Sequence, residues 1–357
     1  MLDAQRINAV LAARQGGHGR GGRMKIESDV IEFLCGVRGS RTLGSPVAVM
    51  IRNRDFENNR ALMDPITGAG EPLTNPRPGH ADYAGALKYR HRDLRNVLER
   101  ASARETAMRV ALGAICGQFL ESLEISTQSY VVAIGPIEAR NDGDVPAERI
   151  ASSSVRCPDA AATAAMIQAI DNAKAAGDTL GGSFVVRVDG LPAGVGSNRQ
   201  PDARLDGVLA GALMGMQTVK AVEVGDGAAA REGSRAHDTF ATADGGIVRG
   251  SNRAGGIEGG MSNGQPVVLR VSVKPIPTLT KALPSVNLHA GVNAPASIVR
   301  SDVCVVPAAS LVGEAMAQLA LMGPILEKYG GDSLEETQDN LRRSRDAAAR
   351  LFDNIPR

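Results

Sequence analysis

Several arginines lie in a segment where their side chains could contact an anionic ligand. Arg14, Arg20 and Arg23 lie within or beside the glycine-rich segment GGHGRGGRM at residues 16–24, where the backbone can approach a ligand closely and offers no apolar partner. The planar guanidinium binds carboxylate and phosphate groups through two parallel hydrogen bonds. The segment therefore predicts an anion site, although a solvated basic loop has the same composition.

The start of a helix offers a second anion site. Ser102 and Glu105 have the S-x-x-E spacing of a capping box, which predicts a helix that begins near Ser102. Free backbone N–H groups and the helix dipole favour a phosphate there, beside Arg100. Ser102 is also the residue expected to cap the helix, and the two roles are compatible. The apolar stripe expected along this helix is formed by Met108, Leu112, Ile115, Phe119 and Leu120.

His80 is a candidate for proton transfer. Prolines at positions 76 and 78 stiffen its loop, and an imidazole in water titrates at about pH 6.5, where it can donate or accept a proton. Four other histidines are scattered along the chain. A lone histidine is often structural, so the spacing alone leaves both interpretations open.

Arg300 and Asp302 precede the apolar run at residues 303–306. If a strand begins there, their spacing of two residues puts both side chains on one face of it. One could bind an anion while the other accepts a proton. A surface ion pair would give the same pattern.

The composition excludes several function classes. The chain has 357 residues, a net charge of +1 and 3% aromatic residues, so it lacks the positive charge and the stacking platforms of a nucleic-acid-binding protein. Only seven of its 40 basic residues are lysines, which suits a ligand with several anionic groups but also follows from arginine-rich codon usage. The four cysteines show no paired spacing, and no Ser-His-Asp order, P-loop or HExxH motif is present. We find neither a signal peptide nor a run of about twenty uncharged apolar residues, and we expect a cytoplasmic protein that does not enter a membrane.

Alternating helical and strand patterns are expected to position these residues. Besides the helix from Ser102, helices are predicted over residues 1–13, 159–176, 206–216, 309–328 and 333–351. Strands are predicted over residues 25–33, 45–53, 131–134, 183–188, 219–224, 267–273 and 303–306. Residues 225–264 hold glycine pairs and few aliphatic side chains, which predicts a long loop over a binding site. Because no linker separates two cores, we expect residues 1–357 to form a single domain.

Longer motifs resemble those of the chorismate synthase family. The most specific are RQGGHGRGGRMKIESDVIEFLCGVRGSRTLGSP at residues 14–46, RPGHADYAGALKYRHRDLRNVLERASARETAMRVALGA at residues 77–114, and RSDVCVVPAA at residues 300–309. NRAGGIEGGMSNGQP at residues 252–266 and KPIPTL at residues 274–279 extend the resemblance over almost the whole chain. The sequence VLERASARET resembles the bacterial form of the family rather than the fungal form, which also reduces flavin.

The resemblance implies a flavin-dependent lyase. Its substrate would be 5-enolpyruvylshikimate 3-phosphate, which loses phosphate by anti-1,4 elimination to give chorismate in the shikimate pathway to aromatic amino acids. Reduced FMN would be required although no net redox change occurs, and NADPH would act only indirectly, through a separate flavin reductase. The resemblance also implies an α+β fold, a β-α-β sandwich with internal pseudo-symmetry, and a homotetramer.

The resemblance assigns roles to individual residues. His80 matches the histidine that protonates reduced flavin, and Asp302 matches an aspartate near flavin N5 that helps to take up the departing ring proton. The substrate side is matched by Arg14, Arg20, Arg77 and Arg300, of which Arg14 and Arg20 also match a nicotinamide-nucleotide site. The FMN contacts are matched by Arg100, Ala101, Ser102, Gln217, Thr218, Gly259, Lys274, Pro275, Ile276, Pro277, Thr278 and Arg300. No metal ligand is implied.

One family feature is missing from the sequence. The family opens with a strand that bears Gly-Glu-Ser-His-Gly, and here the first residues already belong to the helix that follows it. We expect the true start to lie upstream, because the later motifs are intact. The alternative is a catalytically impaired flavin-binding or structural paralogue.

Overall fold

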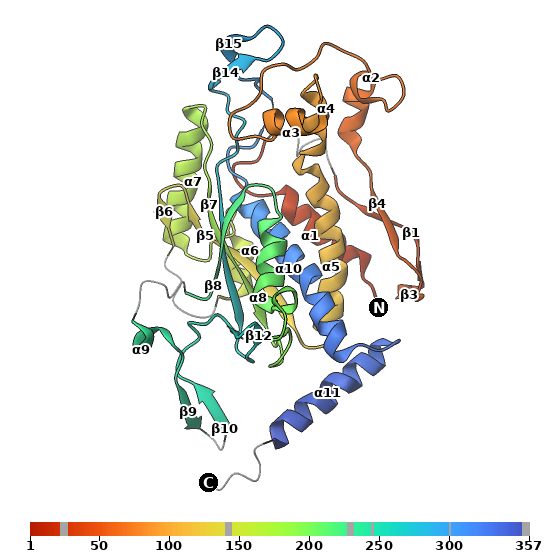
Figure 1. The fold of residues 1–357 in the computed structure, drawn as a ribbon, viewed down its shortest axis with the longest axis vertical. Helices are drawn as coiled ribbons and strands as arrows, with labels where there is room; N and C mark the ends of the chain where they lie inside the picture. The colour runs from red at the N-terminus through yellow and green to blue at the C-terminus, as the bar shows by residue number, and fades with distance from the viewer. Residues whose placement is uncertain (22–27, 140–144, 227–231, 244–245, 300, 352–357) are drawn as a thin grey trace.

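The computed structural model describes residues 1–21, 28–139, 145–226, 232–243, 246–299 and 301–351 (Figure 1). The helices are α1 (Ala4–Gln15), α2 (Arg60–Met63), α3 (Asp82–Tyr89), α4 (Arg95–Arg100), α5 (Thr106–Ser122), α6 (Ala147–Ser152), α7 (Ala160–Ala175), α8 (Leu205–Met214), α9 (Gly233–Ala236), α10 (Val306–Tyr329) and α11 (Leu334–Arg350), with the 3-10 turns η2 (Arg54–Asn59), η3 (Ala103–Glu105) and η4 (Pro201–Ala203). The strands are β1 (Ile31–Cys35), β2 (Val37–Arg38), β3 (Arg41–Thr42), β4 (Ala48–Ile51), β5 (Ser126–Ile134), β6 (Ile137–Glu138), β7 (Gly182–Asp189), β8 (Val219–Val224), β9 (Phe240–Ala243), β10 (Gly246–Arg249), β11 (Ile257–Glu258), β12 (Met261–Ser262), β13 (Val267–Val273), β14 (Pro284–Asn287) and β15 (Val292–Pro295).

A five-stranded sheet forms one layer of the fold. Its strands run in the order β6-β5-β7-β13-β8, and each neighbouring pair is antiparallel. Side chains along β13 alternate between buried and partly buried positions, so one face of the sheet turns valine and leucine side chains toward the core. Antiparallel pairing beside packed helices makes this an α+β fold, as predicted.

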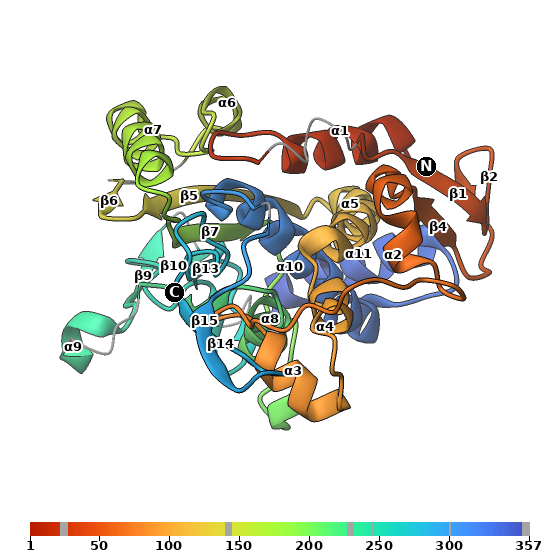
Figure 2. The same ribbon diagram turned by 90° about the horizontal axis from the view of Figure 1, so that it is seen from above.

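Helices α1, α5 and α10 lie between this sheet and the two-stranded ribbon of β1 and β4 (Figures 1 and 2). α10 packs on β5 and β7, while α1 contacts β1 and α5 contacts β4. The layers are therefore sheet, helices and ribbon, which is the β-α-β sandwich implied by the resemblance.

Small residues bring α5 and α10 together. A Cβ atom added to Gly113 would lie 2.4 Å from Cβ of Ala315, and one added to Gly117 would lie 2.7 Å from Nε2 of Gln318. The glycines therefore let the helix backbones approach closely. The predicted apolar stripe is wrong at Leu112, which is 37% exposed, because the contact face is built from glycine and alanine rather than from large side chains.

The helix predicted from Ser102 begins later. Ser102 Oγ accepts a hydrogen bond from Arg104 N (3.3 Å) and caps η3, and α5 starts only at Thr106. The Glu105 carboxylate accepts from Arg109 and Gln217, and no capping box forms here. Arg100 is consequently the last residue of α4 and not the first of the long helix.

Other boundaries match more closely. The strand at residues 267–273 is confirmed, as are the helices at residues 159–176 and 333–351 to within two residues, the last with its Ser333 capping box. The strand predicted at residues 303–306 is wrong, since only Cys304 forms a bridge, to Leu180, before α10 begins. Pro307 explains the difference because proline suits the first turn of a helix.

The glycine-rich residues 225–264 are not a simple loop. They contain α9, the hairpin of β9 and β10, and the short pair of β11 and β12. The β9–β10 hairpin projects at the opposite end of the molecule from α3 (Figure 1). The described part of this hairpin therefore lies far from the loop that carries His80.

α10 is longer and more apolar than we expected of any helix in this sequence. Among the described helices it alone has the length and hydropathy that a membrane crossing requires. It packs against α1, α5, α8, β5 and β7, and 56% of its apolar window is buried inside the protein. Its apolar character is that of a core helix.

Candidate active site

Most of the predicted site residues lie at one end of the five-stranded sheet, where β13 ends and β7 begins. Lys274 N, directly after β13, donates to Thr218 O (2.9 Å). Leu180 N, just before β7, donates to Val303 O (2.9 Å), which brings Asp302 to the same edge. Segments that are distant in sequence therefore meet at this edge.

His80 belongs to a buried ionic cluster. Asp82 Oδ1 lies 2.6 Å from His80 Nδ1 and accepts from Arg77 Nη2 (2.9 Å), while Asp82 Oδ2 accepts from Arg77 Nε (2.8 Å). Arg77 Nη1 donates to Thr278 Oγ1 (2.9 Å). The side chains of Arg77, His80 and Asp82 are only 6%, 17% and 3% exposed. Most of the donors of Arg77 are thus used inside the protein, which limits its capacity to bind a substrate directly.

Asp82 is held in its ionised form. Burial alone would raise the pKa of this carboxyl group, but hydrogen bonds from His80 and Arg77 outweigh burial and lower its pKa well below the ordinary value. A negative charge therefore stands permanently beside the imidazole.

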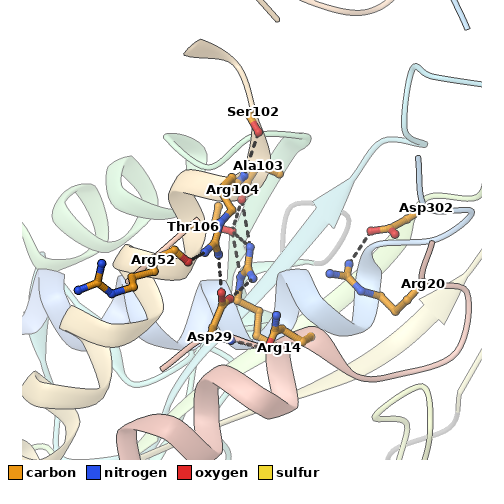
Figure 3. A network of polar contacts seen from close by, with 10 residues as sticks. Arg14, Arg20, Asp29, Arg52, Ser102, Ala103, Arg104, Thr106 and Asp302 are labelled. Carbon is orange, nitrogen blue, oxygen red and sulfur yellow. Dashed lines mark hydrogen bonds and ion pairs between the residues drawn. The ribbon is translucent and has the colours of Figure 1, made fainter. Parts of the chain in front are cut away.

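Arg14 lies in a second cluster, built around Asp29 (Figure 3). The Asp29 side chain is fully buried, with Oδ2 at 3.4 Å from Arg14 Nη1 and Oδ1 at 2.6 Å from Arg104 Nη1. Arg14 also donates to Thr106 Oγ1 (2.7 Å) and Ala103 O (3.1 Å). One carboxylate thus holds two arginines at the start of α5.

The surroundings of Arg14 disfavour its positive charge. Burial and, after it, the nearby positive charge of Arg20 lower its pKa to about 10, although Asp29 acts in the opposite direction. An incoming anion would relieve this positive charge.

Arg20 contacts Asp302 directly (Figure 3). Arg20 Nη1 donates to Asp302 Oδ2 (2.6 Å), and Gly21 N donates to Asp302 Oδ1 (2.6 Å). The glycine-rich loop therefore fixes both oxygens of the predicted catalytic aspartate.

Most of the predicted flavin contacts lie at the rim of the same end. Gln217 Nε2 donates to Glu105 Oε1 (2.7 Å), which fixes the orientation of this carboxamide. Lys274 Nζ donates to Gly79 O, so residues 274–278 are tied to the loop of His80. Arg100 is exposed, while Ala101 and Ser102 are partly buried.

One predicted residue is not brought to this site. Gly259 lies between β11 and β12, near the start of β13, where Val268 N donates to Gly255 O (3.2 Å). The seven residues of β13 span about 20 Å, so Gly259 is at the opposite end of that strand from Lys274. Arg300 lies outside the described residues, as does Arg23.

Sequence reasoning missed the anionic partners. Asp82, Asp29 and Glu105 orient His80, Arg14 and Gln217, respectively. Asp82 could have been identified from the sequence, because it follows His80 by two residues, at the first position of α3. Asp29 could not have been identified in this way, since its partners Arg14 and Arg104 lie 15 and 75 residues away.

Comparisons with known proteins identify the family of the chain. Residues 1–326 match the chorismate synthase family. A chorismate synthase from Desulforudis audaxviator (strain MP104C) is 52% identical over 96% of this chain and 90% of its own length. One from Moorella thermoacetica (strain ATCC 39073 / JCM 9320) is 53% identical over 94% of this chain and 89% of its own length. A crystal structure of chorismate synthase superposes with a TM-score of 0.76 and 38% identity, over 97% of this chain and 90% of that one. The chain therefore belongs to the chorismate synthase family of lyases.

Proposed function

We propose that the chain converts 5-enolpyruvylshikimate 3-phosphate to chorismate by anti-1,4 elimination of phosphate. The ring loses phosphate from one face and a proton from the other, a new double bond forms, and no net oxidation occurs. The observation that carries this proposal is the meeting of His80 with Asp82 and of Arg20 with Asp302 at the same end of the sheet. Family membership supplies the reaction.

The charges of this end suit the proposed substrate. The substrate carries two carboxylates and a phosphate, which arginine binds through paired hydrogen bonds. After burial, the positive charge of Arg20 is the largest influence that lowers the pKa of Arg14, so the two guanidinium groups repel one another. Binding an anion between them would offset that repulsion. Arg77, which Asp82 already engages, would act mainly on His80.

The residues at the rim fit reduced FMN. The exposed guanidinium of Arg100 suits its phosphate, and the Ser102 hydroxyl and Gln217 carboxamide suit its polar chain and ring edge. When bound, reduced FMN supplies an electron-rich ring that assists cleavage of the allylic carbon–oxygen bond. Within one chain, Gly259 does not lie beside these rim residues.

The protein's own part is to hold protons and exclude water. His80 would exchange its proton at Nε2, because Nδ1 is engaged by Asp82. Asp302 would accept a proton at Oδ2 once Arg20 turns to the substrate. Stacked cofactor and substrate would keep water out of the contact between their rings. We further propose a cytoplasmic homotetramer supplied with reduced FMN by a separate, NADPH-using reductase.

An anaerobic assay tests the function. With chemically reduced FMN, the protein should release one phosphate for each chorismate formed, and with oxidised FMN it should release none. His80→Ala should reduce turnover by roughly 10² to 10⁴. His289→Ala is the matched control, since its exposed ring hydrogen-bonds to Arg92 O, away from the predicted site residues, and it should retain full activity. Absence of phosphate release with reduced FMN would contradict the proposal.

A binding measurement tests whether the substrate covers the flavin. Because the substrate should cover the flavin, FMN should bind more tightly when 5-enolpyruvylshikimate 3-phosphate is present. Equal FMN affinity with and without substrate would show that the two do not stack.

A further inference from the structure

We propose that Asp82 is a positioning residue that fixes the proton of His80 on Nδ1, so that Nε2 is the nitrogen that exchanges a proton during the reaction. The catalytic consequence rests on the proposed function. The tautomer itself is a property of this chain and can be measured without turnover.

The contact with Asp82 sets the direction of the hydrogen bond. An ionised carboxylate can only accept, and the pKa of Asp82 is lowered by its partners. With Oδ1 at 2.6 Å, His80 Nδ1 must therefore donate. Free histidine in water prefers its proton on Nε2, so this contact reverses the usual preference.

Arg77 lies against the same imidazole and holds its partner in place. Its guanidinium can only donate, and Nη2 lies 3.0 Å from His80 Nδ1 and 3.3 Å from His80 Nε2. An atom at these two distances lies over the face of the ring and not along the in-plane lone pair of Nε2, so this contact does not select a tautomer. Arg77 instead acts on the tautomer through Asp82, whose two carboxylate oxygens accept from its Nε and Nη2 (2.8 and 2.9 Å).

The carboxylate of Asp82 cannot readily turn away. Its Oδ2 accepts from both N and Nε of Arg77 (3.0 and 2.8 Å), and Arg77 is anchored in turn to Thr278. Asp82 is also the first residue of α3, whose backbone fixes its Cα. The orientation of the imidazole therefore follows from the fold rather than from bound ligands.

Two other histidines provide internal references. His289 Nε2 lies 2.9 Å from Arg92 O, and His18 Nε2 lies 2.8 Å from Asp171 Oδ1. Both acceptors require a proton on Nε2. His80 should therefore show the opposite tautomer from His18 and His289 in the same sample.

Ring ¹⁵N chemical shifts measure this directly. In protein labelled with ¹⁵N-histidine and held at alkaline pH, where imidazoles are neutral, His80 should show a protonated Nδ1 and an unprotonated Nε2. The His80 signals are assigned by their absence in His80→Gln. A wild-type spectrum with the proton of His80 on Nε2 would overturn the inference, without the need for any Asp82 variant.

Asp82→Asn tests the cause. The amide oxygen is a weaker acceptor, so the population of Nδ1–H should fall and the Nε2–H form should appear. Unchanged signals from His289 and His91 would show that the variant is folded. Asp171→Asn, which removes the carboxylate beside His18, is the control and should leave the His80 signals unchanged. Retention of the Nδ1–H form in Asp82→Asn would contradict the inference.

Kinetics connect the tautomer to the reaction. Asp82→Asn should lower kcat by roughly 10² with little change in KM, and it should cause no further loss in the His80→Ala background. An equal loss in both backgrounds would show that Asp82 does not act through His80. If wild-type protein is inactive while the spectrum shows Nδ1–H, the proposed function fails and the positioning by Asp82 stands.

Discussion

Arg20 and Asp302, which are 282 positions apart in the sequence, form an ion pair in which Arg20 Nη1 lies 2.6 Å from Asp302 Oδ2. Gly21 N occupies the other carboxylate oxygen at 2.6 Å. The side chains of Arg20 and Asp302 are 11% and 19% exposed, so solvent screens the pair only weakly. A residue expected to bind substrate is thereby linked to a residue expected to accept a proton. Substrate that draws Arg20 away would free Asp302 Oδ2.

Asp302→Asn should therefore impair turnover more than binding. The amide oxygen still accepts from Gly21 N, which keeps the loop in place, but the side chain no longer accepts a proton readily. We expect kcat to fall by roughly 10² to 10⁴, with a smaller change in KM. Steady-state rates of phosphate release under anaerobic conditions provide the measurement.

The matched control for that variant is Asp189→Asn. Asp189 forms a comparable ion pair with Arg187 (2.8 Å) at the other end of β7, and its loss should leave kcat within about a factor of two, as expected for a half-exposed pair. A change in KM alone for Asp302→Asn would refute the proton-accepting role.

Asp29→Asn should destabilise the whole fold. The variant would leave the buried Arg14 and the partly buried Arg104 without their shared counter-charge, and breaking a buried ion pair costs about 3 to 5 kcal/mol. Glu32→Gln is the control, because Glu32 pairs with Arg52 at the surface, and such pairs contribute about 0 to 1 kcal/mol. Urea unfolding followed by circular dichroism should separate the two variants. Equal midpoints would show that the cluster around Asp29 contributes little to stability.

The difference between Asp29 and Asp82 shows what the sequence could predict about the site. Motifs predicted the cationic residues and His80, because glycine-rich and proline-rich segments mark where such side chains are displayed. Asp82 stands two residues from His80 and could have been included on spacing. Asp29 could not, since its contacts to Arg14 and Arg104 arise only when α1, the segment before β1 and the start of α5 pack together.

Gly259 and Leu112 show that the sequence also predicts the fold only in part. Periodicity located α7, α11 and β13 because each buries one regular face. It misplaced the contact face of α5, since glycines carry no hydrophobic signal. The family motif placed Gly259 among the flavin contacts, but the position of that glycine along the length of β13 depends on the course of the whole chain.

Gly113→Ala should weaken the contact between α5 and α10. The new methyl group would lie 2.4 Å from Cβ of Ala315 and 2.7 Å from its carbonyl oxygen, and overpacking of this kind costs about 1 to 3 kcal/mol. Gly211→Ala in α8 is the control, because no atom lies within 4 Å of its added Cβ. Alanine in an open helical position stabilises by about 0.5 to 1 kcal/mol. The two variants should therefore shift Tm in opposite directions, and shifts of the same sign would show that the helices separate without strain.

Glu314→Gln tests a carboxylate that the proposed reaction does not use. Glu314 lies on α10, where its Oε2 accepts from Ser129 Oγ (2.8 Å), and Arg156 Nη2 is 4.0 Å away. Burial raises the pKa of Glu314, although Ser129 and Arg156 act in the opposite direction. The folded state therefore binds this proton more tightly than the unfolded state does.

The sign of the pH dependence follows from this difference. When the pKa is higher in the folded state, the free energy of unfolding falls as pH rises above the ordinary carboxyl pKa. Glutamine keeps an acceptor for Ser129 and cannot ionise, so Tm of Glu314→Gln minus Tm of wild type should increase between pH 5 and pH 8. Glu121→Gln, which removes an exposed partner of Arg6, should show a small difference that is the same at both pH values. Calorimetry at the two pH values measures both. A difference that shrinks with pH would mean that the charge of Arg156 outweighs burial, and that Glu314 is ionised in the folded protein.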